Sequence, residues 1–108
     1  MSVTEYDVVI IGAGVAGLTA GALLSERGFN VALVTKGEPT ACLSTGCIDV
    51  CSQNKNPLSG IRNLPREHPY NLIPEKMIKE SLCLFQSDMN DAGLPYIGSS
   101  DENRSVLS

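Results

Sequence analysis

The chain has 108 residues, enough for one small domain, and a formal net charge of −4. Hydrophobic residues make up 43% of the sequence, so a core can form, although aromatic residues contribute only 5%. With an isoelectric point near 4.8 and no basic patch, the composition argues against nucleic acid as a partner.

Residues 5–36 have the pattern of a strand, a glycine-rich turn, a helix and a second strand. We expect strands at 5–11 and 30–35, the first buried on both faces, and a helix from Val15 to Arg27 that ends at Gly28. This order predicts an α/β fold, the amino-terminal βαβ unit of a Rossmann-like FAD- or NAD(P)-binding fold. Two strands, with a third that residues 94–97 could begin, make an incomplete sheet of this type.

The uncharged stretch at residues 8–24 is better explained by this strand and helix than by a membrane span or a signal peptide. It contains 17 residues, and acidic Glu5 and Asp7 precede it. A spanning helix needs about 20 strongly apolar residues, and a signal peptide needs a positively charged flank. We therefore expect a soluble, cytoplasmic chain without a transmembrane segment.

The turn holds a GxGxxG fingerprint formed by Gly12, Gly14 and Gly17. Gly12 is expected to allow a tight turn, Gly14 to let a pyrophosphate approach the backbone, and Gly17 to let the helix pack closely on the strand. The backbone N–H groups of Val15 and Ala16 would lie in the first helical turn, where unpaired donors attract phosphate. The surrounding strands and helix favour this interpretation over a glycine turn that binds nothing.

The end of the second strand bears on the type of cofactor. Nucleotide-binding folds commonly place an acid there to hold a ribose hydroxyl, but this chain has Thr35 and Lys36, and its next acid is Glu38. Thr35 and Lys36 could hold an adenosine ribose by other hydrogen bonds, or Lys36 could bind the 2′-phosphate of NADP. A third alternative is FMN, which has no adenosine half.

Residues 36–74 show little periodicity and contain five prolines, so we expect a long loop. Within it, Ser44, Thr45 and Gly46 are candidates for contact with a phosphate or a flavin ring, and an ordinary polar loop is the equal alternative. A helix is then expected at 75–92, ended by Gly93. Its apolar stripe is typical of a core-facing side and consists of Ile78, Leu82, Phe85 and Met89.

The four cysteines, Cys42, Cys47, Cys51 and Cys83, match no standard metal-ligand spacing, so we expect reduced thiols and no metal site, with a cluster as the minor alternative. His68, the single histidine, lies in a proline turn and is expected to pack there. No acid–base pair stands at a recognisable spacing, so no catalytic residue is assigned.

Together these motifs make the chain resemble the amino-terminal part of a flavoprotein family, the B-type subunits of anaerobic glycerol-3-phosphate dehydrogenase. The resemblance covers nearly the whole chain. It rests on the glycine fingerprint, Val34–Gly37, Ser44–Gly46 with Ile48–Asp49, His68–Tyr70 and Asn103–Arg104. The cysteines at 42, 47 and 51 depart from the family pattern.

The resemblance implies oxidation of sn-glycerol 3-phosphate to dihydroxyacetone phosphate, with electrons passed to a quinone. It implies a flavin, with FMN favoured over FAD. The implied partners are a catalytic flavoprotein subunit and a membrane-associated iron–sulfur subunit, which would place the chain at the inner face of the cell membrane. The alternative from a different functional class is an NAD(P)-binding module without redox catalysis. A third alternative is an inactive truncated fragment. We expect residues 1–108, as a partial flavin-binding domain, to lack turnover alone.

Overall fold

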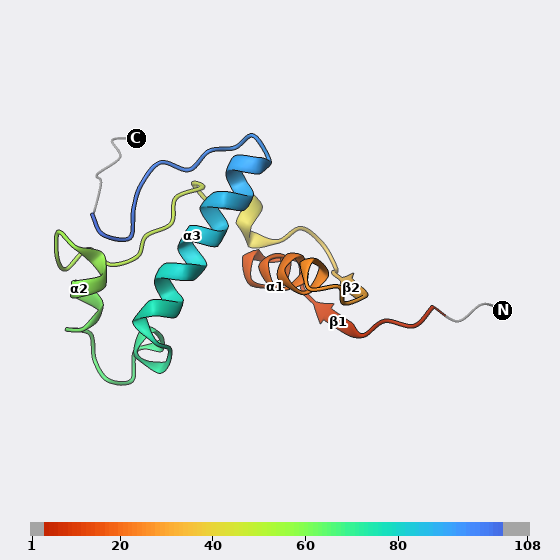
Figure 1. Cartoon of the computed structure of the whole chain (residues 1–108), viewed down its shortest axis with the longest axis horizontal. Coiled ribbons are helices and arrows are strands. Elements are labelled where there is room, and N and C mark those ends of the chain that lie inside the picture. The colour runs from red at the N-terminus through yellow and green to blue at the C-terminus, as the bar shows by residue number, and fades with distance from the viewer. Residues whose placement is uncertain (1–3, 103–108) are drawn as a thin grey trace. The chain divides into compact units, whose positions relative to one another are not determined.

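The computed structural model describes residues 4–102, and the chain divides between Cys47 and Ile48 into two compact units, here called unit 1 and unit 2. The elements of both units are drawn in Figure 1. Residues 1–3 and 103–108, which include the Asn103–Arg104 pair, lie outside the described residues. No helix within residues 4–102 is long and apolar enough to cross a membrane.

Unit 1 contains the predicted strand, helix and strand. These are β1 (Val8–Ile11), α1 (Val15–Glu26) and β2 (Val31–Val34), followed by a short 3-10 helix, η1 (Thr40–Leu43). β1 and β2 pair in parallel, in a register that sets residues 8–11 against residues 31–34. The parallel pair with its crossover helix confirms the predicted α/β class and its Rossmann-like βαβ unit.

The expectation that the first strand is buried on both faces is wrong for the described residues. Ile10 packs under α1, because its side chain lies 3.5 Å from the Cβ position of Gly21. Neighbouring side chains of a strand point to opposite faces, so Val9 and Ile11 face away from α1 and are 58% and 89% exposed. β1 and β2 are also shorter than predicted, because the ladder ends where apolar residues give way to polar ones.

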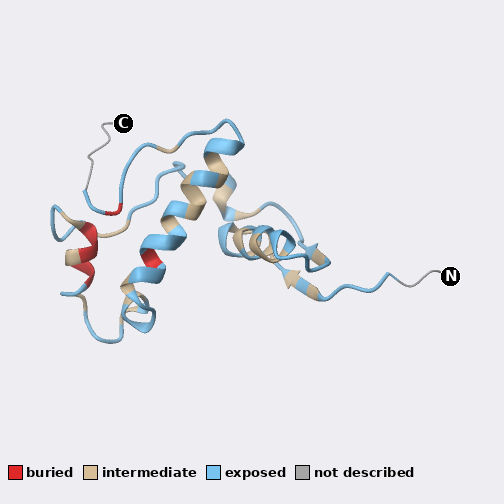
Figure 2. Cartoon of the chain, in the orientation of Figure 1, coloured by how far each residue is buried: buried red, intermediate tan, exposed pale blue. Residues whose placement is uncertain are grey.

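Unit 2 contains α2 (Pro57–Ile61), a 3-10 helix η2 (Pro69–Leu72) and the long helix α3 (Glu75–Asp91). Its core is formed by Leu58 and Ile61 of α2 together with Ile78 of α3. Figure 2 marks these buried positions along the two helices. The predicted apolar stripe of α3 is core-facing as expected, since Ile78 is buried and Leu82 packs against the cluster.

Two secondary-structure expectations are corrected. The segment 36–74 is not one continuous loop, because η1, α2 and η2 lie within it. α2 begins at Pro57 after Asn56, whose side chain accepts a hydrogen bond from the Ser59 N–H at 3.0 Å, and five residues are too few to show a helical period. Residues 94–97 form no strand in the described chain; Pro95 removes a backbone donor there, and Tyr96 packs edge-on against Phe85.

Candidate functional site

The glycine turn is attached directly to the end of β2. The Gly12 N–H donates a 2.8 Å hydrogen bond to the carbonyl oxygen of Val34, the last residue of that strand. Gly12 has a φ of +108°, which a residue with a side chain rarely adopts, so the tight turn predicted at this position is present. The turn and Thr35 therefore lie at the same edge of the sheet, where the carboxyl ends of both strands meet.

Gly17 brings α1 into close contact with β1. A Cβ atom at Gly17 would collide with the carbonyl oxygen of Gly12 and would lie 3.3 Å from Cγ2 of Ile10. The oxygen belongs to the backbone of the turn, so it cannot move aside as a flexible side chain would. Only glycine fits here, which is the packing role that the fingerprint predicts for its third glycine.

Gly14 has the opposite surroundings. It is the residue that precedes α1, and nothing lies within 4 Å of the position that a Cβ would occupy. The backbone bonds of α1 begin with Leu18 N–H to the Gly14 carbonyl, so the N–H groups of Val15 and Ala16 precede them in the first turn. Open space beside a helix amino terminus suits a phosphate group, so the residues present fit the pyrophosphate of a dinucleotide.

Thr35 and Lys36 follow β2 directly and are both exposed. Neither side chain makes a hydrogen bond or an ion pair with another described residue. Both are therefore available to a ligand at the edge that carries the glycine turn.

The side chains of Ser44 and Thr45 bond within their own loop. Ser44 Oγ donates to the Ala41 carbonyl at 2.9 Å and accepts from the Gly46 N–H at 3.3 Å, while Thr45 Oγ1 accepts from the Cys47 N–H at 3.4 Å. These bonds order the loop that follows η1. No hydrogen bond joins the side chains of Ser44 and Thr45 to the glycine turn among the described residues, so their contact with a cofactor stays a prediction.

The family model of the FAD binding domain matches residues 7–77, which include the glycine turn, Thr35, Lys36 and the Ser44–Gly46 loop. The chain belongs to the FAD-binding-domain family. The match supports flavin binding by this family member, and specifically FAD. It gives no support to FMN, which the resemblance had favoured, because the matching family model is described as an FAD binding domain.

Curated relatives agree with the predicted resemblance. Proteins named as the B-type subunit of anaerobic glycerol-3-phosphate dehydrogenase, from Mannheimia succiniciproducens, Vibrio vulnificus and Yersinia pestis, are 31%, 30% and 33% identical to the chain. Each alignment covers 92% of the chain but only 25% or 26% of the relative, so the chain spans about a quarter of their length. No solved structure matches the chain.

The sequence did not predict a set of hydrogen bonds, here called the clamp, at the end of the βαβ unit opposite the glycine turn. Asp7 Oδ2 accepts a 2.8 Å hydrogen bond from the Asn30 N–H, and the Asn30 side chain donates to the Glu5 carbonyl at 2.7 Å. The Asn30 carbonyl in turn accepts from the Asp7 N–H at 2.9 Å. Asp7 and Asn30 each precede a strand, so the clamp fixes the register that brings Gly12 and Thr35 to one edge.

The thiols and the histidine do not form a site in the described residues. None of the four cysteines is in a disulfide, and residues 4–102 contain no group of three or more His, Cys, Asp or Glu that could hold a metal ion. Cys51 lies beside α2, with its sulfur 2.8 Å from the Cβ position of Gly60. His68 Nδ1 accepts from the Tyr70 N–H at 3.2 Å at the start of η2, which confirms its predicted packing role in the turn.

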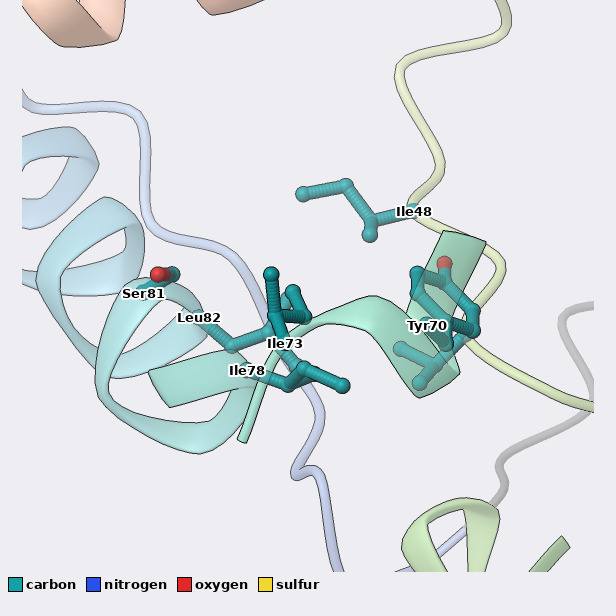
Figure 3. A pocket seen from close by; sticks show the side chains of 7 residues that line it. Ile48, Tyr70, Ile73, Ile78, Ser81 and Leu82 are labelled. Carbon is teal, nitrogen blue, oxygen red and sulfur yellow. The ribbon is translucent and has the colours of Figure 1, made fainter. Parts of the chain in front are cut away.

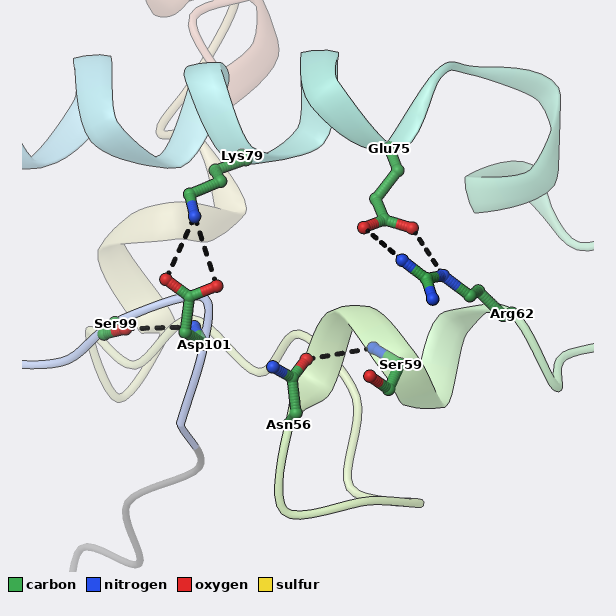
Figure 4. Close-up of polar contacts among 7 residues, drawn as sticks. All are labelled: Asn56, Ser59, Arg62, Glu75, Lys79, Ser99 and Asp101. Atoms are coloured by element: carbon green, nitrogen blue, oxygen red, sulfur yellow. Dashed lines mark hydrogen bonds and ion pairs between the residues drawn. The ribbon is translucent and has the colours of Figure 1, made fainter.

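Ion pairs link the elements of unit 2 (Figure 4). Arg62 makes two bonds to the Glu75 carboxylate, at 2.8 and 2.9 Å, and Lys79 pairs with Asp101 at 3.0 Å. The hydrogen bond from Arg62 lowers the pKa of Glu75, and the same bond raises the pKa of Arg62. These contacts tie α3 to α2 and to the residues after α3, and they are structural.

Unit 2 also has an apolar pocket of about 200 Å³, open to the surface, beside α3 and η2 (Figure 3). None of the predicted cofactor-binding residues lies in it. Its lining residues are Ile48, Val50, Tyr70, Ile73, Ile78, Ser81 and Leu82.

Proposed function

We propose that this chain is the FAD-binding part of the B-type subunit of a glycerol-3-phosphate:quinone oxidoreductase. The observation that carries the proposal is the agreement of the two comparisons. The FAD-binding match spans the glycine turn and the end of β2, and the glycerol-3-phosphate dehydrogenase relatives align with 92% of the chain. The open space at Gly14 supports it physically, because a phosphate has room to approach the backbone there.

Within this proposal, the glycine turn binds the pyrophosphate of FAD. Gly12 and Gly17 shape the turn, and Gly14, which has no side chain, leaves space for the phosphate to approach. The N–H groups of Val15 and Ala16 donate hydrogen bonds to phosphate oxygens. Thr35 and Lys36 form hydrogen bonds with the adenosine ribose.

The loop Ser44–Gly46 is the second proposed contact with the cofactor. Gly46 has a φ of +76°, and the local bonds of Ser44 and Thr45 hold the loop in this shape. The hydroxyl groups retain acceptor lone pairs beyond these bonds, so they can also meet a donor on the cofactor.

The proposed reaction oxidises sn-glycerol 3-phosphate to dihydroxyacetone phosphate, and the two electrons pass to a quinone. Bound flavin supplies the acceptor for two electrons from the substrate. No residue of this chain is assigned to the accompanying proton transfer. The proposed partners are a catalytic flavoprotein subunit and a membrane-associated iron–sulfur subunit, which would hold the cytoplasmic chain at the inner face of the membrane.

We expect the 108 residues to show no dehydrogenase turnover alone. The apolar face formed by Val9, Ile11 and Val34 is at least half exposed at each residue in the described chain. A face of this kind requires cover before the sheet can support a rigid catalytic site.

The alternative is an NAD(P)-binding module, and one observation favours it: Lys36 stands where an acid is common. Identification of the cofactor separates the two functions. The chain is purified, its bound small molecules are released by denaturation, and their masses are measured. FAD near one equivalent supports the proposal, whereas NADP with no flavin, in a chain that also fails to take up added FAD, favours the alternative. FMN with no FAD would contradict the assignment of the turn to a pyrophosphate between two nucleotides.

A further inference from the structure

The charges of unit 1 are distributed unequally between the two ends of its βαβ unit. Glu5 and Asp7 precede β1, while Glu26 and Arg27 stand at the end of α1, which runs back against the strands. All four therefore lie toward the amino ends of the strands. Lys36 is the one cation among residues 4–47 that follows the carboxyl end of a strand.

The strand register places Lys36 on the side of the glycine turn. Ile11 pairs with Val34, and the Gly12 N–H bonds to the Val34 carbonyl at 2.8 Å, so Thr35 and Lys36 continue from the residue that the turn contacts. Both side chains are exposed and bond to no other described residue. Thr35 and Lys36 therefore stand directly after β2, at the position where a nucleotide site usually has an acid.

An acid at this position does two things in a nucleotide site. It accepts hydrogen bonds from the ribose hydroxyls, and its negative charge repels a phosphate on the 2′ oxygen. Thr35 provides no such repulsion, and Lys36 attracts a phosphate. The next acid is Glu38, and the chain bends at residues 36–37, where Gly37 has a φ of +77°, before that acid is reached.

We infer that the adenosine end of this FAD site also accepts a 2′-phosphorylated ribose through Lys36, so that 2′-phosphorylated adenine dinucleotides compete with FAD for the turn. The inference rests on the proposed function, because it presumes that the glycine turn binds a dinucleotide. It adds a second class of ligand to that site and assigns the choice between ligands to Lys36.

Two probes that carry neither flavin nor nicotinamide isolate the adenosine end: ADP-ribose and 2′-phospho-ADP-ribose. Their dissociation constants are measured by calorimetry on the full 108-residue chain and by displacement of FAD. The wild-type chain should bind the 2′-phosphorylated probe at least as tightly as ADP-ribose. Lys36→Met should weaken the 2′-phosphorylated probe about threefold to tenfold relative to ADP-ribose.

Arg27→Met is the matched control, because it also removes one exposed positive charge, but at the opposite end of the unit. It should leave the ratio of the two dissociation constants unchanged, and so should Glu38→Gln. Thr35→Glu should reverse the preference, because it restores the missing acid.

A wild-type chain that rejects 2′-phospho-ADP-ribose about tenfold or more would overturn the inference and leave FAD binding intact. An unchanged ratio in Lys36→Met, or an equal change in Arg27→Met, would also overturn it. Binding of neither probe would contradict the dinucleotide site itself, and the proposed function with it.

Discussion

Unit 1 and unit 2 hold their shapes in different ways. None of residues 4–47 is buried, whereas Leu58, Ile61 and Ile78 of unit 2 are each less than 10% exposed. In unit 1 the geometry comes from the β1–β2 ladder, the Gly12–Val34 bond and the close approach at Gly17. A glycine turn of defined geometry can thus be built from backbone contacts in a region with little apolar burial, while the buried core lies in unit 2.

The largest expected effect is a loss of stability when a core residue of unit 2 is truncated. Ile61 is 4% exposed, and Ile61→Ala should destabilise the unit by about 2–5 kcal/mol, since it removes buried methyl groups and leaves a cavity. Denaturant unfolding followed by circular dichroism at the helical bands measures the change. Ile97→Ala, at a residue that is 84% exposed, is the matched control and should have little effect. Equal losses in the two variants would show that the described core does not stabilise the unit.

The next largest effect is expected when the close packing of α1 on the glycine turn in unit 1 is disrupted. Gly17→Ala drives a Cβ into the Gly12 carbonyl oxygen, and overpacking of this kind costs about 1–3 kcal/mol. Hydrogen exchange at the Gly12 amide, which bonds to Val34, should become faster in the variant. The comparison variant Gly14→Ala places its Cβ in open space and should exchange like the wild type. Unchanged exchange in Gly17→Ala would contradict the contact between α1 and the turn.

A smaller effect tests the clamp at the far end of unit 1. Asp7→Ala removes the acceptor of the 2.8 Å bond from the Asn30 N–H and should cost about 1 kcal/mol, because the bond is charge-assisted but exposed. The loss should appear in denaturant unfolding of unit 1. Asp7→Asn keeps an acceptor oxygen in place and should recover most of the stability. A variant Asp7→Ala as stable as the wild type would mean that the ladder needs no clamp.

The smallest effect concerns the exposed ion pair of unit 2 and its dependence on pH. Because Arg62 lowers the pKa of Glu75, the ionised pair stabilises the fold above the ordinary pKa of a glutamate, and that stabilisation is lost as the pH falls through the lowered value. Thermal unfolding of the wild type should therefore show a small drop in midpoint at acid pH that Glu75→Gln lacks. Glu80→Gln, which breaks the more distant Lys76–Glu80 pair at 3.5 Å, should retain the drop. A drop of the same size in Glu75→Gln would assign it to other carboxylates.

The parts of the fold that sequence could predict are those with a local pattern. The apolar run before Gly12, the spacing of the glycines and the stripe at Ile78 and Leu82 each predict their element because neighbours in the chain decide it. α2 escaped prediction because five residues do not complete two helical turns. The third predicted strand failed because Pro95 cannot donate to a ladder and no partner strand lies beside residues 94–97 in the described chain.

In the candidate site too, features with a local sequence pattern could be predicted and those without one could not. The roles of Gly12 and Gly17 follow from the fingerprint, because a positive φ and a close approach are needed wherever this turn occurs. The Asp7–Asn30 clamp joins residues 23 positions apart, so it becomes visible only once the strand register is known. Its one signal in the sequence is that each of these polar residues directly precedes an apolar strand.

The central claim is that the open space at Gly14 receives a phosphate of FAD. Gly14→Val tests it most directly, because the backbone at Gly14 has φ −72° and ψ 176°, which valine adopts, and the added side chain meets no protein atom within 4 Å at its Cβ. Titration of FAD into the full 108-residue chain should give binding for the wild type and none for Gly14→Val, with hydrogen exchange of the β1–β2 amides equal in the two. FAD binding of wild-type strength in Gly14→Val would contradict the account.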